Sequence, residues 1–144
     1  MPEYGRVLVA IDLSDASGPI LKRALRVSQS LDAELHLLHV VEYIPVEPMG
    51  EALLPAVDIE QELAEGARRR LEELATAAGA AELSRQVVTG SIKSEVIRVA
   101  RELDVDLIII GSKERHGLGV MVNLTEDTIL HAAPCDVLAV RILR

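Results

Sequence analysis

The stretch VLVAIDLSDAS at residues 7–17 decides the fold class. Its first five residues, Val7–Ile11, form a continuous aliphatic run, which is typical of a strand that is buried on both faces of a parallel sheet. The run ends in Asp12, and Ser14 is placed to cap a helix that we expect to extend to about Ser30. A buried strand that leads directly into an amphipathic helix predicts an α/β architecture.

The same alternation continues along the rest of the chain. Further strands are predicted at Glu34–Val41, Gln86–Thr89, Asp106–Ile110 and Asp136–Ile142. Further helices are predicted at Ile59–Ala78, which Gly79 is placed to end, at Ser94–Leu103 and at Glu126–His131. This order predicts a single domain over residues 1–144, a doubly wound parallel sheet of five strands with right-handed crossovers and helices on both faces.

The composition limits the classes of function. The chain has 144 residues, 49% of them hydrophobic, with two Tyr and no Phe or Trp, so the core must be aliphatic. Without aromatic faces the chain lacks the stacking platforms that bind single-stranded nucleic acid. The net charge of −8 opposes phosphate backbones and anionic lipid, so we expect neither nucleic-acid nor membrane-surface binding.

The expected location is the cytoplasm. Cys135 is the only cysteine, which fits a reducing compartment. The start of the chain lacks the pattern of a signal peptide, and the longest apolar runs, such as LIIIG at residues 107–111, are too short to span a bilayer. Cys135 itself is expected to be a small core residue rather than a nucleophile.

The candidate ligand site lies where the strands end. In an open parallel sheet, ligands bind beyond the carboxyl ends of the strands, where the strand order reverses. Asp12 follows the first strand, His39-Val40-Val41 closes the second, and Gly111 follows the fourth. Asp12 could bond a ribose hydroxyl or a base edge, or it could be a carboxylate that caps the following helix.

Other kinds of site find little support. The sequence holds no G-x-x-x-x-G-K-S/T loop, no G-x-G-x-x-G after the first strand and no G-x-S-x-G elbow. The four histidines lack the spacing of a metal pair, and His36 and His39 are predicted to be packed or rim residues on opposite strand faces. The run Arg68–Arg70 is interpreted as a solvated helix face with i,i+4 pairs. The Pro-rich connection at residues 42–57 is either functional or a surface loop.

Taken together, these segments resemble the universal stress protein family over essentially the whole chain. The resemblance rests on VLVAIDLSDAS, ELHLLHVVE, GSIKSEVIRVARELDVDLIIIGS, RHGLG and HAAPCDVLAVR in this order. It implies a flavodoxin-like sheet with strand order 3-2-1-4-5 and a homodimer through the last strand, residues 136–142. In nucleotide-binding members, the base and ribose lie at the positions that match Ala10, Ile11, Asp12 and Val40.

The family's phosphate loop is matched only in part. The resemblance implies a pattern G-x-x-G-(eight or nine residues)-G-S/T, in which Gly111 matches the first glycine and Thr125 the hydroxyl. Glu114 takes the second glycine position, and Asn123 or Leu124 the third. A carboxylate beside a triphosphate repels it by a few kcal/mol at short range. We therefore expect no tight ATP binding, as in the A-type branch of the family, which is described as lacking it.

Three functions follow as hypotheses. The first is a non-catalytic stress-response or signalling module that acts as a homodimer, with no cofactor, no metal and a protein partner that the sequence does not identify. The second is a switch in which ATP, with magnesium, or a related adenine nucleotide occupies the Asp12–Val40–Gly111 cleft. The third, a slow ATPase, is the weakest, because no general base or pair of metal-binding carboxylates is visible beside the loop.

Overall fold

The computed structural model describes residues 3–42, 56–113 and 129–142, without the side chains of residues 56–58, 113 and 142. Most of the Pro-rich connection at residues 42–57 lies outside these residues. So do the predicted phosphate-loop positions Glu114, Asn123, Leu124 and Thr125.

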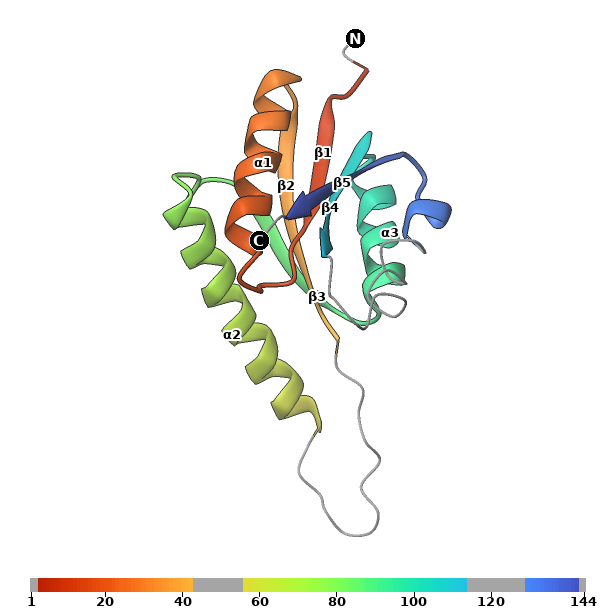
Figure 1. The fold of residues 1–144 in the computed structure, drawn as a ribbon. Coiled ribbons are helices and arrows are strands. Elements are labelled where there is room, and N and C mark those ends of the chain that lie inside the picture. Colours follow the sequence, from red (N-terminus) through yellow and green to blue (C-terminus); the bar gives the residue numbers. More distant parts are fainter. Residues whose placement is uncertain (1–2, 43–55, 114–128, 143–144) are drawn as a thin grey trace.

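The sheet has the predicted architecture (Figure 1). Its strands are β1 (Arg6–Ala10), β2 (Glu34–Val41), β3 (Ser84–Thr89), β4 (Leu107–Lys113) and β5 (Asp136–Ile142). They form one five-stranded sheet in the order β3-β2-β1-β4-β5, and each neighbouring pair is parallel. The predicted fold class and strand order are therefore confirmed.

Helices cover both faces of this sheet. Figure 1 shows α1 (Ser17–Ser30) and α2 (Ala56–Ala77) on one face and α3 (Ile92–Glu102) on the other. Residues 129–132 add a helical turn that leads towards β5. This turn confirms the end of the helix predicted at Glu126–His131, whose first three residues lie outside the described chain.

Two aliphatic cores lie on opposite faces of β1. Val7 and Val9 belong to the core under α1 and α2, whereas Leu8 belongs to the core under α3. All three side chains are at most 1% exposed. A fully buried Leu or Val side chain stabilises a fold by roughly 1.5–3 kcal/mol, so the double burial of this strand explains its uninterrupted aliphatic sequence.

The helix boundaries correct two predictions. α1 begins after Ala16 without a side-chain cap, so the predicted cap at Ser14 is wrong. Instead, the Ser14 carbonyl accepts a bond from the Ser17 amide at 3.0 Å, because the chain makes a turn before it enters the helix. α3 begins two residues before the predicted Ser94, because the Ser91 hydroxyl accepts the Ser94 amide at 3.2 Å and caps the helix there.

The end of α2 agrees with the prediction for Gly79. This glycine has a φ of +75°, a left-handed conformation that favours glycine. The Ala80 amide donates to the Ala75 carbonyl at 2.8 Å, which satisfies one of the last carbonyls of the helix. Gly79 therefore ends α2 for the expected backbone reason.

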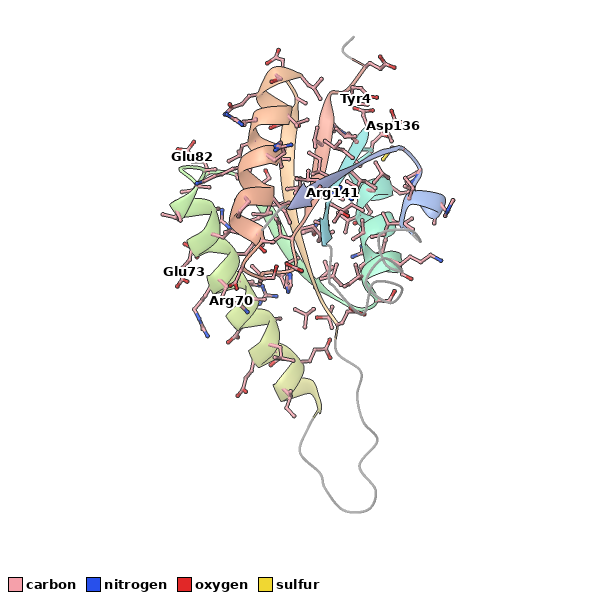
Figure 2. All side chains as sticks on the ribbon, viewed as in Figure 1. Tyr4, Arg70, Glu73, Glu82, Asp136 and Arg141 are labelled. Atoms are coloured by element: carbon pink, nitrogen blue, oxygen red, sulfur yellow. The ribbon has the colours of Figure 1, made fainter. Side chains whose placement is uncertain are left out.

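At the amino end of the sheet, side chains tie the first strand to its neighbours. Asp106 accepts the amides of Gly5 and Arg6 at 2.8 and 3.0 Å, which joins the start of β1 to the segment before β4. The Tyr4 hydroxyl donates to the carboxylate of Asp136 at the start of β5, and both residues are labelled in Figure 2. This bond and the charge of Asp136 raise the pKa of Tyr4.

His36 is a packed histidine, as predicted, and its surroundings disfavour the protonated ring. It lies on β2 opposite Leu8 of β1. Its Nε2 is buried and has no hydrogen-bond partner among the described residues. Burial lowers the pKa of His36, because the charged imidazolium is less well solvated inside the protein than in water.

We predict that His36 makes the fold sensitive to acid. Because its folded-state pKa lies below the unfolded value of about 6.5, the unfolded chain binds a proton first as the pH falls. Stability should therefore decline below about pH 6.5 and be insensitive to His36 above it. His36→Leu should reduce this decline and raise the free energy of unfolding at neutral pH by about 1 kcal/mol, as measured by urea unfolding.

His131→Leu is the control for this experiment, because His131 is exposed on the turn before β5. If His36→Leu and His131→Leu unfold with the same pH dependence, the acid sensitivity has another origin.

Candidate functional site

The predicted site residues meet at the carboxyl edge of the sheet. β1 pairs with β2 and β4 in a register that places Ala10 opposite Leu38 and Val9 opposite Ile109. Extended along the strands, this register brings Ala10, Ile11, Asp12, Val40 and Gly111 to one edge. Thr125, the remaining predicted site residue, lies outside the described residues.

Three of these residues turn their side chains into the cores. Ile11 is 3% exposed in the core under α1 and α2, and Val40 is 7% exposed in the core under α3. Ala10 packs against the core under α3. A ligand at this edge would therefore meet mainly the backbone of these residues.

Part of that backbone is already bonded. The Ile11 amide donates to the Leu38 carbonyl at 2.8 Å, and the Ile11 carbonyl lies 2.7 Å from Nδ1 of His39. Because a carbonyl can only accept, His39 must carry a proton on Nδ1, which leaves Nε2 as the acceptor of the neutral ring. His39 thus fastens the end of β1 to β2.

Asp12 is exposed and holds its own loop together. Its Oδ1 accepts the Ser14 amide at 2.9 Å and the Ser17 hydroxyl at 3.3 Å. An aspartate that bonds the amide two residues further on forms an Asx turn. These bonds give Asp12 a structural role in the turn that leads into α1, although no side chain caps this helix.

The loop is also held from α2. Leu13 has a φ of +61°, which is costly for a side chain of its kind, and its carbonyl accepts Nη2 of Arg70 at 2.7 Å. Figure 2 shows Arg70 on α2 beside this loop. Arg68–Arg70 are all exposed, as predicted for a solvated helix face. The predicted i,i+4 pairs are not formed, because Arg70 bonds the loop instead and the run forms no ion pair within the described residues.

His39 and Arg70 make bonds at this edge that the sequence did not predict: His39 was expected to be a packed or rim residue, and Arg70 to be part of a solvated helix face. His39 directly precedes the predicted Val40, so a polar residue at a strand end was a usable signal. Arg70 gave no such signal, because it is separated from Leu13 by 57 residues and only the packing of α2 brings them together.

Gly111 has a packing role. A Cβ at this position would lie 2.3 Å from Cδ1 of Ile20, a distance that real Cβ atoms essentially never show. Ile20 is itself 3% exposed in the core, so it has little freedom to move. This glycine, which lies within β4 rather than after it as predicted, is thus needed for the close approach of α1, whether or not it also meets a ligand.

Chemistry of other kinds is not evident in the described part of the chain. Residues 3–42, 56–113 and 129–142 contain no group of three or more His, Cys, Asp or Glu placed to hold a metal ion. Among the helices described, none is long and apolar enough to cross a membrane. Cys135 packs against the core under α3, and burial raises the pKa of its thiol, which favours the protonated form.

The sequence and the fold can be compared with known proteins on this basis. The family model of the universal stress protein family matches residues 3–141. Universal stress protein A homolog 1 of Coxiella burnetii is 38% identical over 138 residues, which cover 95% of this chain and 96% of the relative. The chain therefore belongs to the universal stress protein family.

Solved structures agree with this assignment. The universal stress protein UspA from Lactobacillus plantarum has a TM-score of 0.71 at 26% identity, over 96% of this chain and 98% of its own. A universal stress protein solved in complex with cAMP has a TM-score of 0.64 at 24% identity, over 96% and 97% of the two chains. The second likeness shows the shared fold.

We predict that Gly111→Ala destabilises the fold through its contact with Ile20. Overpacking of this kind costs about 1–3 kcal/mol, which should appear as a lower urea midpoint. Ile20→Val removes the Cδ1 atom that the new Cβ would meet. In the Ile20→Val background, Gly111→Ala should therefore cost about 1 kcal/mol less than in the parent chain. An equal cost in both backgrounds would show that another contact requires the glycine.

Proposed function

We propose that this chain is a non-catalytic stress-response module of the cytoplasm, whose cleft at the carboxyl edge of the sheet does not bind ATP tightly. One observation carries the proposal: the polar groups at this edge are bonded to one another. Asp12 bonds Ser14 and Ser17, His39 bonds Ile11, and Arg70 bonds Leu13. A ligand that approached the atoms already bonded here would compete with the bonds that hold the β1–α1 loop.

The sequence supports the same conclusion at the phosphate end. Glu114 takes the place of a glycine in the family's phosphate loop, and its carboxylate would repel a triphosphate. Asn123 or Leu124 takes the place of another glycine, and leucine adopts a left-handed conformation poorly. Both substitutions weaken a loop whose backbone amides would have to approach phosphate oxygens closely.

The titratable groups support a module without catalysis. Groups with a displaced pKa often mark catalytic sites. Within the described residues these groups are Tyr4, His36, Arg98 and Cys135, and none of them is one of the predicted site residues. Each displacement has a structural cause, which is burial, the bond to Asp136 or the pairing of Arg98 with Glu95.

The nucleotide prediction is tested on the purified protein. After purification without added nucleotide, heat denaturation should release no adenine nucleotide detectable by absorbance and chromatography. Titration with ATP and magnesium should leave Tm unchanged, whereas a ligand at a hundredfold its Kd would stabilise the fold by about 2.7 kcal/mol. Glu114→Gly should increase the response to ATP if its charge is the obstacle. Stoichiometric release of ATP would contradict the proposal.

The second candidate function is a switch operated by an adenine nucleotide. It is favoured by the universal stress protein that was solved with cAMP and by the retained residues Ala10, Ile11, Asp12 and Val40. cAMP carries one phosphate, so it depends less on the phosphate loop than ATP does. A rise in Tm with cAMP but not with ATP would favour this second function.

We further propose that the module is a homodimer through β5. β5 is the last strand in the sheet order, so one of its edges has no partner strand among the described residues. Leu130 and Leu138 are 54% and 37% exposed beside this edge. They line a hollow of about 570 Å³ together with Tyr4 and Asp136. An unpaired strand edge with exposed leucines suits pairing with a second copy.

Ala139→Pro should disrupt this dimer, because proline cannot donate to a strand ladder. Light scattering should then report a monomer, and circular dichroism should confirm that the variant is folded. Leu138→Glu places a charge beside the same edge without changing the backbone, and it should weaken the dimer as well. If both variants fold and stay dimeric, the interface lies elsewhere.

A further inference from the structure

The outer face of α1 carries only positive charge. Lys22, Arg23 and Arg26 are exposed there, on the side opposite the buried Ile20 and Leu21. α1 contains no acidic residue, although the whole chain has 23 acidic and 15 basic residues. By contrast, α2 carries six carboxylates and three arginines. The cationic face of α1 is therefore a local exception in an acidic protein.

These cations do not stabilise the fold. Within the described residues, none of the three forms an ion pair or a side-chain hydrogen bond. On α3, in contrast, Arg98 pairs with Glu95 at 2.9 Å and with Glu102 at 3.0 Å. Lys22 and Arg26 are four residues apart, and like charges at this spacing repel on a helix. The arrangement thus costs stability, which a binding role would explain.

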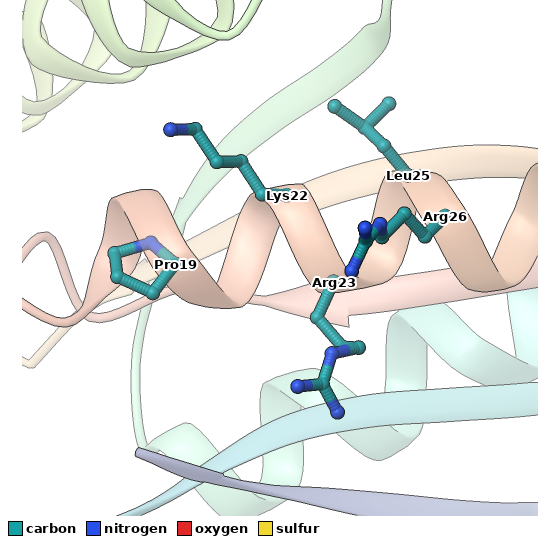
Figure 3. A pocket seen from close by; sticks show the side chains of 5 residues that line it. All are labelled: Pro19, Lys22, Arg23, Leu25 and Arg26. Carbon is teal, nitrogen blue, oxygen red and sulfur yellow. The ribbon is translucent and has the colours of Figure 1, made fainter. Parts of the chain in front are cut away.

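The same face also has apolar side chains that lie between the cations. A shallow hollow of about 490 Å³ is lined by Pro19, Lys22, Arg23, Leu25 and Arg26. Figure 3 shows Lys22 and Leu25 extending to one side of the helix axis and Arg23 to the other. The side chains of Pro19 and Leu25 therefore lie among three cationic groups that point in different directions.

We propose that this face of α1 binds an acidic segment of a partner protein, in which carboxylates flank an apolar side chain. The carboxylates would pair with Lys22, Arg23 and Arg26, and the apolar side chain would cover Pro19 and Leu25. From residue 19 to residue 26 the helix rises about 10 Å, the length of three or four residues of an extended chain. A short segment is sufficient to fill the face.

Charge complementarity selects this partner over other polyanions. A nucleic acid or an anionic membrane carries charge far beyond the face of α1 and would lie against the carboxylates that give the chain its net charge of −8. A short peptide can confine its charge to the three cations, and charges more than about 8 Å away are screened at physiological ionic strength. This peptide-binding face is separate from the dimer edge at β5 and from the carboxyl edge of the sheet, and it depends on neither of them.

The test uses the full chain and a fluorescein-labelled peptide of alternating glutamate and leucine, followed by fluorescence anisotropy. Lys22→Glu/Arg26→Glu should weaken binding about tenfold or more. Arg68→Glu/Arg69→Glu makes the same change of net charge on exposed residues of α2, and it should change the affinity less than about twofold. A peptide with serine in place of leucine should bind more weakly, because it cannot cover Pro19 and Leu25.

Several results would overturn the proposal. These are no binding by the parent chain, an equal loss in the two double variants, or equal binding of the serine peptide. If a labelled single-stranded DNA binds the parent chain and Lys22→Glu/Arg26→Glu abolishes that binding, the partner of this face is a nucleic acid rather than an acidic peptide. A change in molar mass for Lys22→Glu/Arg26→Glu in light scattering would make the face an interface between copies. The results of the nucleotide-release experiment and of the β5 variants do not affect this test.

Discussion

The burial of β1 on both faces is the constraint on which the rest of the structure depends. Val7 and Val9 pack under α1 and α2, and Leu8 packs under α3, so neither face of the strand meets water. Its backbone groups must then be satisfied by strands on both sides, and β2 and β4 pair with it in parallel. Helices on both faces and a central position for β1 follow from this requirement.

The same constraint shapes the carboxyl edge. Because Ile11 and Val40 send their side chains into opposite cores, the edge is built mostly from backbone and a few polar side chains. Those side chains bond the end of β1 and the loop after it: Asp12 turns the chain, His39 bonds the Ile11 carbonyl, and Arg70 bonds the carbonyl of Leu13, which has a left-handed conformation. An edge of this kind keeps the architecture of a ligand site while its hydrogen bonds serve the fold.

Charge is distributed unevenly over the helices, and the distribution has different physical consequences in each. On α3, arginine and glutamate pair within the helix. On α2, Arg70 reaches a backbone carbonyl of another element. On α1, the cations have no internal partner within the described residues, and this leaves their charge available to a second molecule. Net charge alone would not distinguish these three cases.

The pattern of the sequence by itself determined the alternation of strands and helices and the approximate position of each element, whereas the resemblance to the universal stress protein family implied the strand order and most of the residues at the carboxyl edge. A short aliphatic run such as Val7–Ile11 is typical of a strand buried on both faces, and glycine at position 79 is favoured where the backbone is left-handed. The tertiary structure alone decided what Arg70 and Gly111 do. Their roles depend on distances across elements, from Arg70 to Leu13 and from Gly111 to Ile20, and no pattern along the chain encodes such distances.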